Sequence, residues 1–166
     1  MQITVEKIWI SPGHDFKGQF GKGRNNNGVV SCESVTCTAG MGIVGDRYYG
    51  YSEDYKGQVT LFSDEVAAAL QEHFKIDNLD RSVLRRNVLV SGVDLNSLIG
   101  KRFRIGETVF TGSEECTPCF WMNEAVSEGA HEWLKGRGGL RCRIEQSGSL
   151  RTGDVQLEVL GDGPVG

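Results

Sequence analysis

The stretch KRFRIGETVFTGSEECTPCFWM, residues 101–122, decides how the chain is expected to fold. It begins with two strand-like runs, Lys101–Ile105 and Thr108–Phe110, in which apolar residues recur. Gly106-Glu107 separates the two runs, and a two-residue link that contains glycine is typical of a tight β-hairpin. The stretch therefore predicts a pair of antiparallel strands.

Two thiols follow this hairpin. A helix-like run begins near Phe120, so Cys116 and Cys119 lie at a strand-to-helix junction. The first turn of a helix presents unpaired N–H groups and a positive dipole, and both favour a thiolate, the form that attacks electrophiles or binds metal. Cys119, the thiol nearest the helix start, is the expected functional residue. Pro118 fixes the backbone just before it.

Short strand-like segments recur along the rest of the chain. Alternating or β-branched apolar residues predict strands at residues 3–10, 29–39, 58–62, 88–90, 140–144 and 155–160. Longer helices are expected after Ser63, a good N-cap residue, and from Phe120 to about Lys135. We expect a single domain over residues 1–166. Its predicted fold is mostly β, with a closed or nearly closed β-barrel and a few inserted helices, because closure removes exposed strand edges.

Composition and charge restrict the function classes. The 166 residues carry 18 basic and 22 acidic side chains, and a net charge of −4 argues against a nucleic-acid binder or a protein that binds anionic membranes. No apolar run is long enough to span a membrane, and residues 1–6 do not form a signal peptide. We therefore expect a cytoplasmic protein. Its five cysteines favour free thiols, a metal site or a catalytic cysteine over a disulfide framework.

Two hypotheses about the cysteines come from their spacing. Cys32-x4-Cys37 and Cys116-x2-Cys119 together could supply four thiolates to zinc, but regular pleating would place Cys32 and Cys37 on opposite faces of their strand. Cys-Thr-Pro-Cys also resembles the thioredoxin active site. That motif belongs in a βαβ context and works beside a later cis-proline, whereas residues 119–163 contain no proline.

Several charged residues indicate an anion site. Arg85 and Arg86 stand together directly before a predicted strand. Because a planar guanidinium matches the oxygens of a phosphate, this pair is the expected phosphate site, with a solvated ion pair as the alternative. Asp46 and Arg47 follow a glycine-rich run and form either a structural turn or the edge of a pocket. The polar loop from His14 to Gly28 is either an irregular excursion or a lid over a pocket.

A series of motifs in a fixed order covers nearly the whole chain. The motifs are GIVGDRY (42–48), QVTLFSDE (58–65), RRNV (85–88), DL with LIG (94–100), PC (118–119), GRGG (136–139) and RTGD (151–154). This series resembles the MOSC domain, a family named after the C-terminal domain of molybdenum-cofactor sulfurase. The chain looks like a stand-alone bacterial-type member. The resemblance implies a mostly β, barrel-like domain, in agreement with the strand pattern.

The resemblance also implies a ligand and a set of site residues. The ligand is the molybdenum cofactor, a phosphorylated pterin dithiolene (molybdopterin) that carries molybdenum. The cysteine after the proline, here Cys119, is implied to be the catalytic thiol and the molybdenum ligand, and a soft thiolate suits this metal. Two groups are implied to bind the cofactor: the phosphate-binding Arg85, Arg86 and Asn87, and the pocket-edge residues Asp46, Arg47 and Gln58.

The expected function is that of a molybdenum-dependent oxidoreductase, because related enzymes reduce N-hydroxylated compounds. Such an enzyme needs an external electron-donor protein, since the sequence carries no flavin, haem or iron–sulfur signature. The alternative is a carrier whose Cys119 takes sulfur from a sulfur-donor protein as a persulfide, or holds the cofactor, and passes it on. A third hypothesis is a redox-active thiol protein in which Cys116 and Cys119 form a disulfide.

Overall fold

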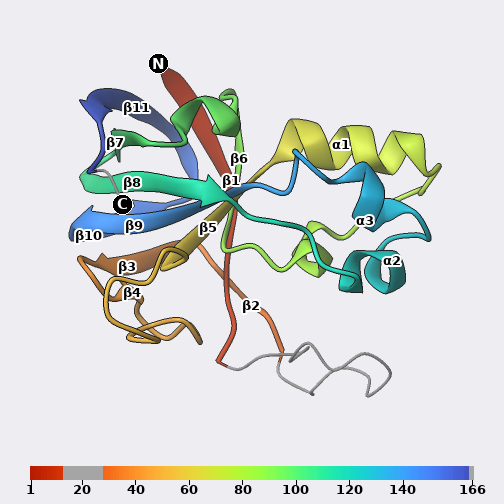
Figure 1. Cartoon of the computed structure of the whole chain (residues 1–166), viewed down its shortest axis with the longest axis horizontal. Coiled ribbons are helices and arrows are strands. Elements are labelled where there is room, and N and C mark those ends of the chain that lie inside the picture. The colour runs from red at the N-terminus through yellow and green to blue at the C-terminus, as the bar shows by residue number, and fades with distance from the viewer. Residues whose placement is uncertain (13–27, 165–166) are drawn as a thin grey trace.

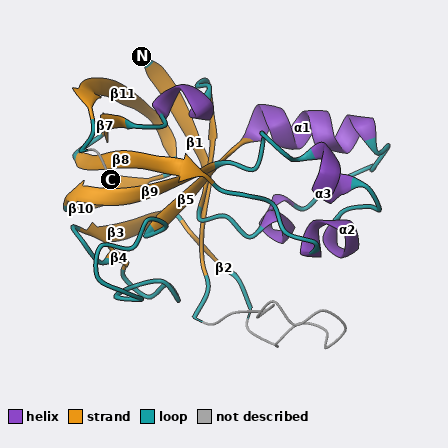
Figure 2. Cartoon of the chain, viewed as in Figure 1, coloured by secondary structure: helices purple, strands orange, loops and turns teal. Residues whose placement is uncertain are grey.

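A computed structural model describes residues 1–12 and 28–164, so the expected lid loop falls outside the described residues up to position 27. Strands make up 42% of the described residues and helices 18%, which confirms the prediction of a mostly β fold. The strands gather on one side of the molecule and the helices α1, α2 and α3 on the other (Figure 2).

The described strands and helices have the following bounds. The strands are β1 (Gln2–Ile10), β2 (Val30–Cys32), β3 (Ser34–Thr38), β4 (Gly42–Ile43), β5 (Val59–Ser63), β6 (Val88–Ser91), β7 (Lys101–Ile105), β8 (Thr108–Glu115), β9 (Leu140–Gln146), β10 (Gly148–Arg151) and β11 (Gly153–Asp162). The helices are α1 (Asp64–His73), α2 (Trp121–Ala125), α3 (Ala130–Trp133) and the 3₁₀ turns η1 (Arg81–Leu84) and η2 (Leu95–Leu98). Within the described ranges, no helix has both the length and the apolar content needed to cross a membrane.

Seven of the described strands close into a β-barrel, in the order β11-β7-β8-β9-β5-β6-β1 (Figure 1). Closure depends on β1, because one edge of this strand pairs with β6 while the other is shared by two strands. Residues 2–5 pair with β11, and residues 8–10 pair with β2. The predicted hairpin is confirmed, since β7 and β8 pair antiparallel on either side of Gly106-Glu107.

One connection brings the two arginines to the rim of the barrel. Among the described strands, β5 and β6 alone pair in parallel, and a parallel pair needs a crossover connection. The crossover contains α1, which begins after Ser63 as predicted, because the Ser63 Oγ accepts a hydrogen bond from the N–H of Val66 at 3.2 Å. It then passes through η1, so that Arg85 and Arg86 lie between η1 and β6.

Two apolar clusters form the interior. The first fills the barrel and includes the stacked rings of Phe103 and Phe110, whose centroids lie 5.6 Å apart. The second lies between the barrel wall and the helices and includes Phe62 of β5, Leu70 of α1 and Met122 of α2. Each of these five side chains is almost completely buried. The second cluster therefore attaches the helical layer to the barrel at the place where the thiols lie.

Two predicted elements differ from the observed ones. The strand expected over residues 29–39 breaks at Glu33 into β2 and β3, and β3 joins a separate sheet with the order β10-β3-β4. The helix expected from Phe120 to about Lys135 is two short helices. Between them, Gly129, the N-cap residue of α3, has a φ of 94°, a left-handed conformation that interrupts a continuous α-helix.

Candidate functional site

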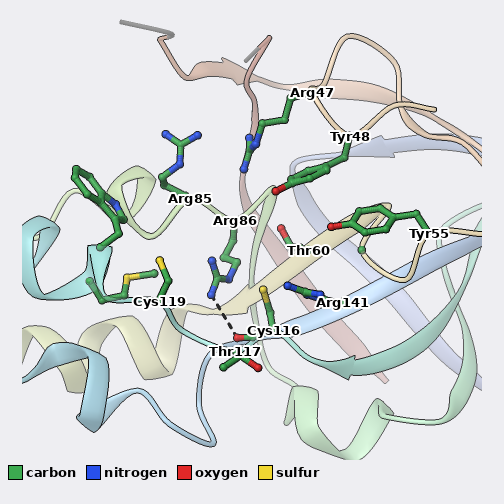
Figure 3. Close-up of a pocket in the computed structure, with 13 residues that line it drawn as sticks. Arg47, Tyr48, Tyr55, Thr60, Arg85, Arg86, Cys116, Thr117, Cys119 and Arg141 are labelled. Carbon is green, nitrogen blue, oxygen red and sulfur yellow. Dashed lines mark hydrogen bonds between the residues drawn. The ribbon is translucent and has the colours of Figure 1, made fainter. Parts of the chain in front are cut away.

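A pocket of about 210 Å³ opens where the barrel meets the helical layer (Figure 3). Its lining comes from the β4–β5 loop, β5, the η1–β6 link, the segment from the end of β8 into α2, and β9. The lining residues are Arg47, Tyr48, Tyr55, Gly57, Thr60, Arg85, Arg86, Cys116, Thr117, Cys119, Trp121, Met122 and Arg141. Four of them carry guanidinium groups, two carry thiols and none carries a carboxylate, although the chain as a whole has a net charge of −4. The pocket is therefore suited to an anionic ligand that also contacts a cysteine thiol.

The two thiols of the pocket differ in exposure, and hydrogen bonds hold the backbone of the buried one. Cys119 is exposed, whereas Cys116 is only 5% exposed. The Cys116 N–H donates to the carbonyl of Gly139 at 2.8 Å, and the Cys116 carbonyl accepts from Arg86 at 3.4 Å. A Cβ atom at Gly138 would overlap the same carbonyl, so this close approach requires glycine. The cysteine segment thus packs directly on the GRGG motif.

The helix that follows Cys119 is shorter than expected. It has five residues, and its N-cap residue Phe120 makes no side-chain cap hydrogen bond. A helix of little more than one turn aligns few peptide dipoles, so it contributes less to the site than a long helix would. The Met122 N–H donates to the Cys119 carbonyl at 3.0 Å, which joins the thiol segment to α2.

Arg141 is the cation that lies beside the Cys116 sulfur (Figure 3). Burial acts to lower the pKa of its guanidinium. The interactions with Cys116, Tyr55 and Glu114 together outweigh this effect, and the pKa lies above its usual value. Arg141 also forms an ion pair with Glu114 at 3.4 Å. It therefore keeps a positive charge next to the buried thiol.

The two neighbouring arginines have different tasks. The Arg86 guanidinium donates to three backbone carbonyls: to Leu84 at 3.0 Å, to Gly138 at 3.0 Å and to Cys116 at 3.4 Å. It has five N–H groups, so two remain for a ligand. Arg85 has a φ of 59°, the left-handed conformation that ends η1, and its side chain points away from Cys116 (Figure 3).

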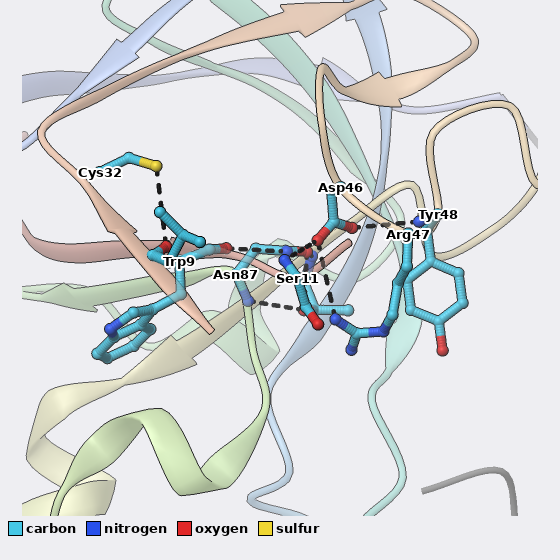
Figure 4. Close-up of polar contacts among 9 residues, drawn as sticks. Trp9, Ser11, Cys32, Asp46, Arg47, Tyr48 and Asn87 are labelled. Atoms are coloured by element: carbon cyan, nitrogen blue, oxygen red, sulfur yellow. Dashed lines mark hydrogen bonds and ion pairs between the residues drawn. The ribbon is translucent and has the colours of Figure 1, made fainter. Parts of the chain in front are cut away.

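Arg47 enters the pocket from a turn that Asp46 stabilises (Figure 4). The buried Asp46 carboxylate accepts from the N–H of Ser11 at 3.0 Å and of Tyr48 at 3.3 Å, and lies 3.8 Å from Arg47 Nη1. The Arg47 guanidinium carbon lies 4.8 Å from the centre of the Tyr48 ring. Its Nε is buried and has no hydrogen-bond partner among the described residues. Asp46 therefore positions Arg47 without lining the pocket itself.

Gln58 and Asn87, which the motifs singled out, do not line the pocket. The Asn87 amide oxygen accepts from the N–H and the hydroxyl of Thr60 at 3.0 and 3.2 Å, and its amide nitrogen donates to the Trp9 carbonyl at 3.2 Å (Figure 4). The Gln58 amide oxygen accepts from the N–H of Ile144 at 2.9 Å. Both side chains are buried, and they connect barrel strands to one another.

The candidate site residues named from the sequence did not include one wall of the pocket, although the motif GIVGDRY ends at Tyr48. Tyr48, Tyr51 and Tyr55 form an aromatic cluster with ring centroids 4.8 to 5.4 Å apart, and two of these rings line the pocket. Burial is the main cause that raises the pKa of Tyr55. The close spacing of the three tyrosines was the available signal. Arg141 gave none, because its neighbours are known only once β9 pairs with β5 and β8.

The other cysteines lie away from the pocket. Cys37 and Cys142 are buried in the barrel core, where burial raises the pKa of both thiols, to about 12 for Cys37. The Cys32 thiol contacts the carbonyl of Val30 at 3.8 Å. The part of the chain that the structure describes holds no cluster of three or more His, Cys, Asp or Glu side chains that could hold a metal ion. A metal in the pocket would therefore need further ligands from a cofactor that it is bound to.

Comparisons with known proteins agree with this architecture. A family model described as the MOSC domain matches residues 42–156. The YuaD protein from Bacillus subtilis has a similar solved structure, with a TM-score of 0.74, 22% identity, and 96% of each chain covered. YiiM from Geobacillus stearothermophilus gives 0.67 at 12% identity over 95% of this chain and 75% of that one. YiiM from Escherichia coli has a TM-score of 0.67 at 15% identity, over 98% of this chain and 71% of that one. No curated protein sequence matches the chain.

Proposed function

Because the chain belongs to the MOSC domain family, we propose that its pocket binds the molybdenum cofactor and that Cys119 ligates the metal. One observation carries this proposal: four arginines and two thiols line a single pocket to which none of the described residues contributes a carboxylate. A phosphorylated ligand with a sulfur-bound metal needs this combination of cations and thiols.

The residues of the pocket fit such a ligand. Cys119 is exposed and offers one soft thiolate, and one is enough when the cofactor brings its own dithiolene sulfurs. The buried Nε of Arg47 has no partner among the described residues, and a phosphate oxygen would satisfy it. Arg86 has two N–H groups to spare after its three backbone contacts. The bound cofactor would supply the redox chemistry, while these residues hold it and orient it.

Within this proposal the protein acts as a reductase of N-hydroxylated compounds that receives electrons from an external donor protein. Tyr48 and Tyr55 stack on each other and line the pocket, where their rings offer aromatic contacts to a substrate. Asp46 fixes the turn that carries Arg47, and Gln58 and Asn87 hold the strands around the pocket. These last three residues are positioning residues in our account.

The proposal is tested by expression in two hosts, one that makes the molybdenum cofactor and one that cannot. We expect bound pterin and reduction of an N-hydroxylated compound by a chemical electron donor only in protein from the first host. Cys119→Ser should lose the activity, and Cys32→Ser, which lies outside the pocket, should keep it. A persulfide on Cys119 without any pterin would favour the carrier function. A protein from the first host that is active without pterin would refute the proposal.

A further inference from the structure

Cys116 has a structural environment that the proposed function does not explain. It lies three positions before Cys119, is 5% exposed and lines the same pocket. Its sulfur points into the pocket next to the Arg141 guanidinium (Figure 3). We propose that Cys116 is a sulfur-acceptor site that takes the outer sulfur atom of a small sulfane-sulfur oxyanion, of which thiosulfate is the simplest. This activity is independent of the molybdenum cofactor.

A persulfide site needs a thiolate that is stabilised and shielded. Arg141 supplies the stabilising charge, because its guanidinium lies beside the sulfur in the same pocket (Figure 3). Burial supplies the shielding, since bulk thiols reach an exposed persulfide more easily than one that is 95% covered. Cys119 has the opposite character, because it is exposed.

The backbone holds Cys116 in this position. Its N–H is bound to the Gly139 carbonyl at 2.8 Å and its carbonyl to the Arg86 guanidinium. The side chain therefore projects from a fixed point while the pocket in front of it stays open. An attacking group with a fixed direction needs little reorganisation to reach its substrate.

The rest of the pocket is suited to the oxyanion. Arg47 carries a buried Nε that has no hydrogen-bond partner among the described residues, and its side chain is only 12% exposed. This orphaned donor indicates an anion independently of the thiols, because a buried N–H without a partner is costly. Among residues 1–12 and 28–164, no carboxylate lines the pocket to repel a dianion.

The chemistry balances without an additional oxidant or reductant. The Cys116 thiolate attacks the outer sulfur of thiosulfate, and a new sulfur–sulfur bond forms. The sulfur–sulfur bond of thiosulfate breaks, and sulfite leaves with the electron pair. The products are a Cys116 persulfide anion and sulfite, so the total charge is unchanged. Arginines that stabilise the thiolate also stabilise the persulfide anion that replaces it.

The test uses the full chain, reduced and freed of reductant, from a host that cannot make the molybdenum cofactor. The protein is incubated with thiosulfate, the released sulfite is measured, and thiols are trapped for peptide mass spectrometry. We expect one sulfite per chain and the added mass of one sulfur atom on the peptide at Cys116. This readout on the unchanged protein needs no variant, so it stands even if a Cys116 variant fails to fold.

Variants then separate Cys116 from its neighbours. Cys116→Ser should release no sulfite, and Arg141→Gln should slow the release by roughly tenfold or more, because it removes a charge beside a buried thiolate. Cys32→Ser and Arg104→Gln, which change a cysteine and an arginine outside the pocket, should match the wild type. Sulfur found on Cys119 alone, an unchanged rate in Arg141→Gln, or no sulfite from the wild type would each overturn the inference. None of these outcomes depends on whether the protein binds molybdenum.

Discussion

The guanidinium of Arg86 donates a hydrogen bond to the carbonyl of Cys116 at 3.4 Å, although 30 residues separate them in sequence. The same guanidinium donates to the carbonyls of Leu84 and Gly138. Arg86 therefore joins the η1–β6 link, the cysteine segment and the GRGG motif in one network. Its first role is to assemble the pocket, and these three contacts use three of its five N–H groups.

Arg86→Gln should destabilise the fold. The substitution removes charged hydrogen bonds to three carbonyls, and we expect a loss of about 2–4 kcal/mol in the free energy of unfolding. Urea denaturation measures this loss. Arg104→Gln is the matched control, because its exposed ion pair with Glu158 should contribute less than about 1 kcal/mol. Equal effects of the two substitutions would show that Arg86 has no assembling role.

Asn87→Ala should reduce stability but not ligand binding. Without the amide, the Thr60 N–H and the Trp9 carbonyl lose their side-chain partner, at a cost of about 2–4 kcal/mol in total. The molybdenum content per folded chain should stay at the wild-type level. The control Asn96→Ala removes an exposed contact to Gly136 and should cost less than about 1 kcal/mol. A lower molybdenum content with normal stability would give Asn87 a direct role in binding.

Gly138→Ala should displace the cysteine segment, because the new Cβ would overlap the Cys116 carbonyl and press on Pro118. We expect a loss of about 3 kcal/mol in unfolding free energy. The alkylation rate of Cys116 by a small reagent should change as well. Gly136→Ala is the control, because no atom lies within 4 Å of the Cβ that alanine would add there. Its only cost comes from the left-handed φ of 81°, and we expect a loss of about 1–2 kcal/mol in unfolding free energy. An unaltered Cys116 rate in Gly138→Ala would contradict the packing described.

Stability should fall in alkaline solution because of a buried thiol. Burial raises the pKa of Cys37 from 9.0 to about 12, so between these values the native state holds a proton that the unfolded state has lost. The free energy of unfolding then decreases as pH rises above 9, by about 1.4 kcal/mol at pH 10 from this thiol. Urea denaturation at pH 8 and pH 10 measures the loss, which should be smaller in Cys37→Ala. Equal losses in both proteins would remove Cys37 as the cause.

The barrel could be predicted from the sequence because its evidence is local. The Gly106-Glu107 hairpin and the N-cap at Ser63 each depend on a few neighbouring residues, and both are observed. The break of the expected helix at Gly129 was harder to predict, because the run around it keeps apolar residues at helical spacing. Local patterns therefore specified the elements better than their ends.

The pocket could be predicted only in part. Arg85, Arg86, Arg47 and Cys119 were expected in one site, and all four line the same pocket. Arg141 could not be found, because it reaches the pocket only through the pairing of β9 with β5 and β8. Asn87 stands next to Arg86 in sequence, yet its side chain points toward Thr60 and Trp9. Successive side chains of an extended segment point to opposite faces, so the two neighbours contact different parts of the protein.

Elemental analysis of molybdenum in purified protein tests the central claim most directly. The protein is made in a host that supplies the cofactor, and the wild type is compared with Cys119→Ser and Cys32→Ser at equal folded concentration. We predict about one molybdenum per chain in the wild type and in Cys32→Ser, and a loss of roughly tenfold or more in Cys119→Ser, as expected for removal of a direct ligand. The same molybdenum content in Cys119→Ser as in the wild type, or none in the wild type, would contradict the account.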